Sequence, residues 1–252
     1  MGITLKMDVF EFYKTIRLKK AKKYFSQLEK LYSKIPDTKG CLENINKEKG
    51  CGGWCCFHQS PQLLYVEFLY SWNEIFNNWD LEEIADVIEL AMINYVLGFT
   101  TKGCIFFDKS TKMCRIHKFR PYNCRIYAIT PKEEFQPRYE RMKEIYKGVL
   151  GAVIRNQCDL VSTIDNKPIS TKDTDRWWEK LIDIEQKLGI SKNNINDDTG
   201  GSYRTFHDHL LLYLTSDDIM DKLQGIRLSD NIEEKLMAVH TFMQYVKKKL
   251  KK

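Results

Sequence analysis

The sequence lacks any apolar run that approaches the length of a bilayer span, so we expect no transmembrane helix. A secretory signal is also missing, because Lys6, Asp8 and Glu11 interrupt any apolar segment near the start. The myristoylation pattern that begins at Gly2 fails, since position 6 is lysine instead of serine or threonine. We therefore expect a cytoplasmic protein without membrane contact, whose thiols meet a reducing environment.

Several enzyme signatures are missing as well. The chain has no phosphate-binding loop, no glycine-rich dinucleotide fingerprint and no Ser/His/Asp order of the kind used in acyl transfer. The cysteine run of bacterial ferredoxins is also absent. These absences leave open whether the protein is an enzyme, and the sequence names no substrate.

The composition is that of a globular protein with a moderate excess of positive charge. The chain has 252 residues, of which 43% are hydrophobic and 29% are charged, enough for one large or two small domains. The net charge of +6 comes largely from two basic stretches, 17–23 and 247–252. No recognised nucleic-acid motif accompanies them, so we interpret both as solvated helix faces and expect no nucleic-acid partner.

Helical periodicity dominates the apolar pattern. Apolar residues recur at three- and four-residue steps over 8–35, and Asp80 with Glu83 forms a capping box for a helix that ends near Gly98. The run 63–72 is so continuously apolar that periodicity does not distinguish strand from helix. Further helices are predicted over 137–155, from Thr174 or Asp175 to Gly189, after Ser216 and from Asp230.

Two cysteine-rich segments, 40–62 and 99–131, carry turn signals and are predicted as loops and short extended pieces. Their shape must come from something other than a hydrophobic face, and a bound metal would supply it. The predicted fold class is mostly α, an irregular helical domain with cysteine-rich metal-binding loops. We expect a single helical domain over 1–252, with a metal-binding core over 41–158 and a C-terminal helical extension over 159–252.

Cysteine is the most informative residue that is present. The candidate metal ligands are Cys41, Cys51, Cys55, Cys56, Cys104, Cys114, Cys124 and Cys158. Four thiolates are enough for one cubane cluster or one closed zinc site, so this number predicts two centres or some buried structural thiols. Cys41 and Cys158 have the loosest spacing and are the candidates for buried thiols. A disulfide framework is disfavoured, because it suits small secreted domains and the adjacent Cys55 and Cys56 bridge poorly.

Arginines and glycines flank the cysteines. Arg115, Arg120 and Arg125 would offset the negative charge of a thiolate-rich centre, and we predict them as cofactor-binding residues. The alternative for each arginine is a role in surface solubility. Three glycines of the first segment allow a close approach of the backbone to sulfur: Gly50, Gly52 and Gly53.

Four histidines are further candidates for metal ligands. His58 and His117 lie two and three residues from candidate ligands, and either could bind the metal or relay a proton. A lone histidine near a metal loop more often supports a ligand or is exposed. His207 and His209 form an H-x-H pair, which can bind a metal when it lies on a strand. Their distance from the cysteines in the sequence favours a structural role.

The cysteine pattern resembles that of the YkgJ-like cysteine-cluster family. The matching pieces are GCGGWCC at 50–56, CIFF at 104–107 and CRIHKFRPYNCRIY at 114–127. The resemblance implies chelation of zinc or iron, often as an iron–sulfur cluster, within residues 41–158. The chain departs from the family pattern in four ways: Cys41 lies far upstream, three residues instead of two precede the vicinal pair Cys55-Cys56, His117 replaces a tyrosine, and Tyr127-Ala128 replaces a Phe-Pro step.

Two functional readings follow from the thiols and the resemblance. The first is an iron–sulfur protein, with a 4Fe–4S cluster, that serves as a redox partner or as a protein-modifying enzyme. The resemblance extends distantly to flagellin lysine methylases, which carry a similar cysteine set, and so implies protein modification and a protein partner as one form of this reading. The second reading is a non-enzymatic zinc module in which the metal is structural. The number of thiols and the vicinal pair favour the cluster.

Overall fold

The computed structural model describes residues 16–39, 56, 60–97, 103–111, 113–145, 147–148, 158, 161–167, 169–195 and 201–250. Among the predicted site residues, Cys41, Cys51 and Cys55 lie outside these ranges, as do His58 and the three glycines near Cys51. The predicted loop 40–62 falls largely outside them, and residues 8–15 of the helix predicted over 8–35 fall wholly outside them.

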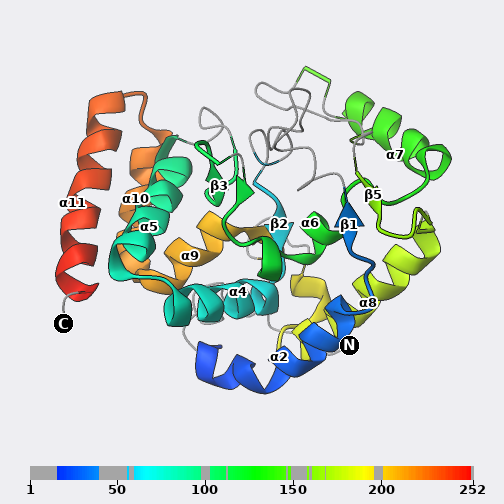
Figure 1. Cartoon of the computed structure of the whole chain (residues 1–252). Helices are drawn as coiled ribbons and strands as arrows, with labels where there is room; N and C mark the ends of the chain where they lie inside the picture. The colour runs from blue at the N-terminus through cyan, green and yellow to red at the C-terminus, as the bar shows by residue number, and fades with distance from the viewer. Residues whose placement is uncertain are drawn as a thin grey trace, which may run out of the picture.

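Helices make up most of the described residues, and each described strand has two residues, so the mostly α class is confirmed (Figure 1). The α-helices are α2 (Leu18–Tyr32), α4 (Tyr65–Asn78), α5 (Leu81–Leu97), α6 (Tyr122–Ile126), α7 (Lys132–Ile145), α8 (Thr171–Lys187), α9 (Phe206–Leu214), α10 (Asp217–Leu228) and α11 (Ile232–Leu250). Two 3-10 helices are η2 (His117–Phe119) and η3 (Lys192–Asn194). The strands form three antiparallel pairs: β1 (Thr38–Lys39) with β5 (Ser162–Thr163), β2 (Gln62–Leu63) with β6 (Arg204–Thr205), and β3 (Phe107–Asp108) with β4 (Met113–Cys114).

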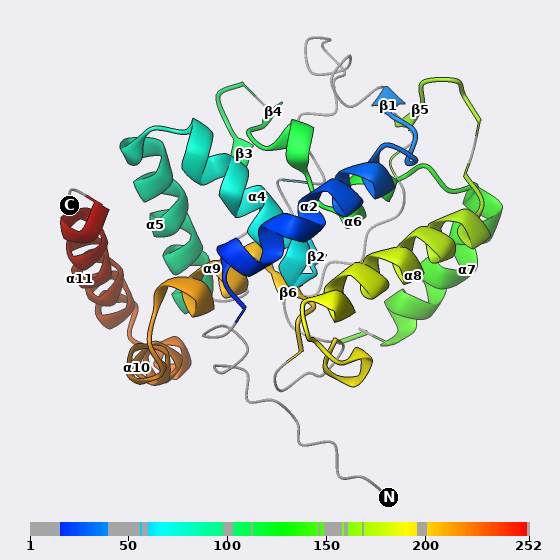
Figure 2. The same ribbon diagram turned by 90° about the horizontal axis from the view of Figure 1, so that it is seen from below.

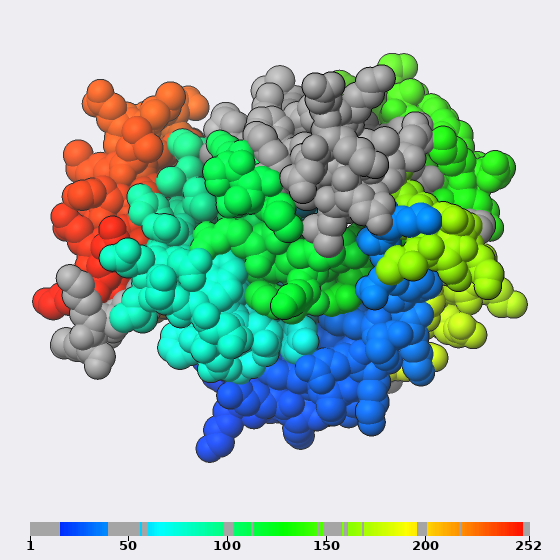
Figure 3. Space-filling view, viewed as in Figure 1, coloured from blue at the N-terminus to red at the C-terminus, as the bar shows by residue number. Residues whose placement is uncertain are grey.

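The helices gather on two sides of the molecule, with α4 and α9 between them (Figures 1 and 2). On one side α5 packs against α9, α10 and α11, and on the other α2 and α8 pack against each other and against α4. The segment that carries the second cysteine cluster lies at the surface between α4, α5 and α2 (Figure 3, green). In the described part of the chain, none of the helices has the length and apolar character that a membrane crossing requires.

Helix α5 begins and is buried as the sequence predicts. The backbone N–H of Glu83 donates to Asp80 Oδ1 at 2.7 Å, and the Asp80 N–H donates to Glu83 Oε2 at 3.3 Å, which is the predicted capping box. The predicted apolar stripe is buried along its length: Ile84, Val87, Ile88, Ala91, Tyr95 and Val96.

The ambiguous run 63–72 is mainly helix, because α4 begins at Tyr65. Two buried carboxylates accept the N–H groups at this helix start, which the helix itself cannot pair. Glu67 accepts from the Leu64 N–H at 2.9 Å, and Glu185 of α8 accepts from Tyr65 and Val66 at 3.0 and 2.8 Å. Because Glu185 belongs to α8, its two hydrogen bonds fix the position of α4 against α8.

Three predicted helix starts were wrong. Helix α7 begins at Lys132 instead of Pro137, which lies inside the helix and leaves one carbonyl without its intrahelical donor. Helix α8 begins at Thr171, because the hydroxyl of Ser170 accepts from the Asp173 N–H at 3.3 Å. Helix α11 begins at Ile232, where Asn231, and not Asp230, accepts from the Glu233 N–H at 3.0 Å.

The end of α8 and the start of α10 agree with the sequence. Gly189 adopts φ +101°, a left-handed conformation that favours glycine and ends a helix. Helix α10 follows Ser216 directly. Helix α9 was not predicted, and it places His207 and His209 on a helix instead of a strand.

Candidate metal centre

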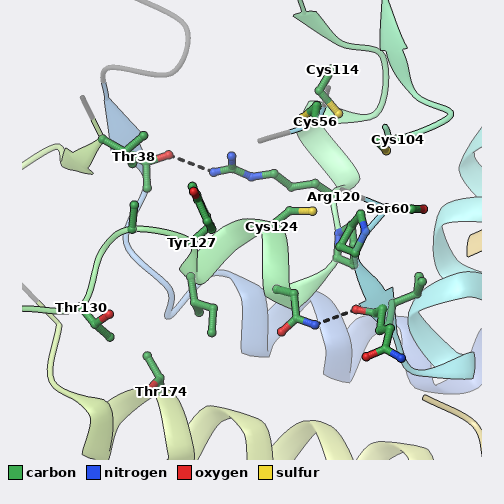
Figure 4. A pocket seen from close by; sticks show the side chains of 18 of the residues that line it. Thr38, Cys56, Ser60, Cys104, Cys114, Arg120, Cys124, Tyr127, Thr130 and Thr174 are labelled. Atoms are coloured by element: carbon green, nitrogen blue, oxygen red, sulfur yellow. Dashed lines mark hydrogen bonds between the residues drawn. The ribbon is translucent and has the colours of Figure 1, made fainter. Parts of the chain in front are cut away.

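The two cysteine segments meet in the folded chain. The backbone N–H of Cys104 donates to the carbonyl oxygen of Cys56 at 2.6 Å. Cys56, Cys104, Cys114 and Cys124 line the same cavity, which has a volume of about 710 Å³ (Figure 4). All four side chains are half-buried. The candidate centre therefore combines residues that are as far apart in the sequence as 56 and 124.

A short hairpin positions Cys104 and Cys114. Strands β3 and β4 pair so that Phe107 lies opposite Cys114, and the Phe107 N–H donates to the Cys104 carbonyl at 3.0 Å. The Asp108 side chain closes the turn by accepting from the Ser110 N–H at 2.8 Å and its hydroxyl at 2.6 Å. These hydrogen bonds hold the pKa of the Asp108 carboxyl well below its usual range. The hairpin thus brings both cysteines to one end.

Helix α6 carries Cys124 and starts directly after Pro121, a residue suited to precede a helix. The N–H of Tyr122 at the helix start donates to Glu67 Oε1 at 2.6 Å, and the Tyr122 hydroxyl donates to the Thr174 carbonyl at 2.5 Å. The short helix is therefore attached both to α4 and to α8, and Cys124 has a fixed place above them.

Glu67 is the buried centre of this attachment. Besides Tyr122 it accepts from the hydroxyl of Tyr32 at 2.5 Å and from the Leu64 N–H. Burial raises the pKa of Glu67, while these hydrogen bonds and the nearby Arg125 oppose the increase. One carboxyl group therefore joins α2, α4 and α6 beneath the cavity.

Arg120 is the predicted arginine that lines the cavity. It is buried, and one terminal nitrogen donates to Thr38 Oγ1 of β1 at 3.0 Å (Figure 4). Its Nε is buried without a hydrogen-bond partner in the described part of the chain. A buried donor of this kind is costly unless an acceptor faces it, and an anionic sulfur would be such an acceptor.

The other two predicted arginines do not line the cavity. Arg115 pairs with Glu83 Oε1 at 3.0 Å and lies 4.2 Å from the ring centre of Trp79. Arg125 donates to the carbonyls of Arg120 and Lys118 at 2.8 and 3.0 Å. It also lies over the Tyr32 ring at 4.1 Å. Both guanidinium groups connect the cysteine segment to the helices.

His117 also lines the cavity, from the 3-10 helix η2 between Cys114 and Cys124. Its Nε2 is buried and has no hydrogen-bond partner in the part of the chain that the structure describes. Burial, together with Arg120 and Arg125, lowers the pKa of His117 to about 4, so the ring is neutral at physiological pH. A neutral imidazole is the form that can bind a metal.

The ligand set is not complete among the described residues. No three His, Cys, Asp or Glu side chains within the described ranges lie close enough together to hold a metal ion as they stand. Cys158 is half-buried and does not appear in the lining of this cavity. The four thiols that share the cavity are soft donors, as is an imidazole to a lesser degree. This donor set fits zinc, iron or an iron–sulfur cluster and does not fit calcium or magnesium.

The cavity extends well beyond the cysteines, a feature that the sequence did not predict. Its far wall comes from the segment between α6 and α7, from α7, from α8 and from the segment before α9, and includes Tyr127, Thr130, Glu134, Phe135, Arg138, Thr171, Thr174, Asp175 and Tyr203. The Glu134 carboxylate accepts from the Thr171 N–H at 2.6 Å and so joins α7 to the start of α8. Four separate elements form this wall, and no local motif marks it in the sequence.

The pair His207 and His209 has the structural role that its distance from the cysteines favoured. His209 is fully buried and packs against the rings of Tyr65 and Phe68, with ring centres 5.5 and 5.3 Å away. Its Nε2 lies 3.0 Å from the Leu63 carbonyl oxygen, and burial lowers its pKa to about 3. His207 Nδ1 lies 3.5 Å from the Ser60 hydroxyl. Neither histidine appears in the lining of the cavity.

Comparison with known proteins gives one match. No curated protein and no solved structure matches the chain. Residues 47–143 match the model of a family named CxxCxxCC and described as a "putative zinc- or iron-chelating domain". The match contains six of the eight cysteines and excludes Cys41 and Cys158. It confirms the predicted resemblance to a cysteine-cluster family and supports metal binding as the general role of this segment.

Proposed function

We propose that this chain is a YkgJ-like iron–sulfur protein in which cysteines from two segments hold a 4Fe–4S cluster. The observation that carries the proposal is the shared cavity, where Cys56 of the first segment lies beside Cys104, with Cys114 and Cys124 in the same lining. The vicinal Cys55 and the nearby Cys51 extend this set on the first segment. We include Cys41 and Cys158 as further proposed ligands, which lie at the two ends of the cysteine-rich region in the sequence.

The surroundings of the thiols support an anionic sulfur-rich centre. Arg120 contributes a positive charge at the cavity and a buried Nε–H that has no protein acceptor in the described ranges. Hydrogen bonds to sulfur and nearby charges set the potential of such centres. An iron–sulfur cluster, when bound, supplies one-electron transfer; the role of the chain is to hold it and to control access to it.

Access to the centre supports a redox or protein-modifying role over a purely structural one. Structural zinc sites are closed by four ligands, whereas these thiols are half-buried and line a cavity of about 710 Å³. A cavity of this size is in the range that accommodates a small molecule or an inserted side chain. The partner that we propose is therefore a protein or its side chain, and the compartment is the reducing cytoplasm.

The test is anaerobic purification of the whole chain from iron-supplied cells, followed by metal and sulfide analysis and an absorption spectrum. We expect brown protein that contains iron and acid-labile sulfide. A Cys124→Ser variant should lose most of both, whereas Ser substitution of Cys158, outside the cavity lining, is the matched control and should lose less. Colourless protein with stoichiometric zinc and no iron would reject the cluster and establish the structural zinc alternative.

A further inference from the structure

The strongest unexplained feature of the cavity is a ring nitrogen. His117 lines the same cavity as Cys56, Cys104, Cys114 and Cys124, yet its Nε2 has no hydrogen-bond partner among the described residues. The atom is also closed to solvent, so water does not satisfy it either. A buried polar atom in this condition is uncommon in folded proteins and calls for a specific partner.

We infer that His117 is a ligand of the metal centre and binds it through Nε2, beside the cysteine thiolates. The inference rests on the proposed function, since it requires that the cavity holds a metal or a cluster. It goes further because it makes the centre a mixed sulfur and nitrogen site, with a ligand that the cysteine pattern does not contain.

The position of His117 in the chain is consistent with this role. The residue begins η2, the single turn that connects the hairpin bearing Cys114 to the helix bearing Cys124. The Phe119 N–H donates to the Ile116 carbonyl at 3.0 Å, and the buried Ile116 anchors the turn in the core. His117 therefore lies between Cys114 and Cys124 in the chain and lines the same cavity as both.

Alternative partners for Nε2 are limited by the neighbouring charges. Arg120 and Arg125 are both close enough to act on the ring electrostatically, and neither can accept a hydrogen bond. A carboxylate partner would leave Nε2 protonated, but Asp37, which also acts on the ring, makes no hydrogen bond or ion pair with it in the described part of the chain. An electron-pair acceptor such as a metal ion satisfies the lone pair of a neutral ring.

The consequence for chemistry is a higher reduction potential than an all-thiolate centre would have. Replacing thiolates by imidazoles raises the potential of iron–sulfur centres, because a neutral ligand stabilises the oxidised state less than an anionic one. An imidazole is also easier to displace than a thiolate from a soft metal. His117 is therefore the ligand that would leave first if a substrate entered the cavity.

The test is X-ray absorption at the edge of whichever metal the purified whole chain contains, because imidazole gives a distinct outer-shell scattering signal. The wild type and a His240→Ala control, altered at an exposed position of α11, should both show this signal. The His117→Ala variant should lose it and bind the metal about 10-fold more weakly in competition with a chelator. The His117→Cys variant, which keeps a soft donor, should retain the metal but also lose the signal.

The outcomes separate this inference from the proposed function. A wild-type protein that contains metal without imidazole scattering, or a His117→Ala variant with an unchanged signal, overturns the inference and leaves metal binding intact. A wild-type protein without metal overturns both. Because the wild-type spectrum alone can reject His117 as a ligand, the test does not depend on the folding of any variant.

Discussion

The two sides of this molecule are stabilised in different ways. Around α5, α9 and α11 the helices bury continuous apolar stripes, and the interior consists of aliphatic and aromatic side chains. Around the cysteine cavity the elements are short, and buried hydrogen bonds and guanidinium contacts hold them in place. Short elements cannot bury enough apolar surface to be stable alone, so the cavity region depends on its contacts with the helices.

The largest expected effect comes from removing a cavity thiol. Cys124→Ser should abolish most metal binding and lower the thermal midpoint by about 10 °C or more, because binding to the native state contributes directly to stability. Scanning calorimetry of both proteins, with and without a chelator, checks the result. A chelator should bring the wild type close to the variant, and no effect of the chelator on the wild type would contradict the dependence on metal.

A substitution on the other side should reverse this pattern. Ile88 of α5 is 2% exposed, so Ile88→Ala should lower the free energy of unfolding by about 2–5 kcal/mol through the cavity it leaves. The metal content of the folded protein should stay unchanged. Urea unfolding and metal analysis of the same sample measure both quantities, and a parallel loss of metal would show that the two sides are not independent.

A smaller, pH-dependent effect should arise where the two sides are joined through α4. Burial raises the pKa of Glu185 to about 7, above its unfolded value of 4.5, so the folded state binds an extra proton between these values. The free energy of unfolding should therefore fall, by about 3 kcal/mol, as the pH rises from 4.5 to above 7. Urea unfolding of the wild type and of Glu185→Gln at pH 4.5 and 8 isolates this contribution. If the stability difference between the two proteins is the same at both pH values, Glu185 does not titrate as described.

Local signals in the sequence predicted the parts of the fold that depend on neighbouring residues. Asp80 and Glu83 predicted the start of α5 because a capping box involves only four residues. Pro137 misled the prediction of α7, since a proline is common at a helix start but lies inside this helix. Helix α9 was missed because its apolar residues are nearly continuous and give no clear period.

The site was predictable only to the extent that its residue types are distinctive. Clustered cysteines have few uses other than metal binding and disulfides, so Cys56, Cys104, Cys114 and Cys124 could be predicted as site residues without any knowledge of the fold. The far wall of the cavity did not, because Thr130, Glu134 and Thr174 are common residues that tertiary packing brings together. The sequence also did not distinguish Arg120, which lines the cavity, from Arg115 and Arg125, because tertiary contacts decide which arginine faces the cavity.

The hydrogen bond from the Tyr122 N–H to Glu67 has a consequence for how the site is loaded. Folding of α2 and α4 already orients α6. The conformational entropy of Cys124 is therefore lost when the chain folds, and not when the metal binds. An incoming ion or cluster meets one thiol that is preorganised, and only the remaining ligands have to adjust around it. Preorganisation of this kind raises affinity without adding a single contact to the metal.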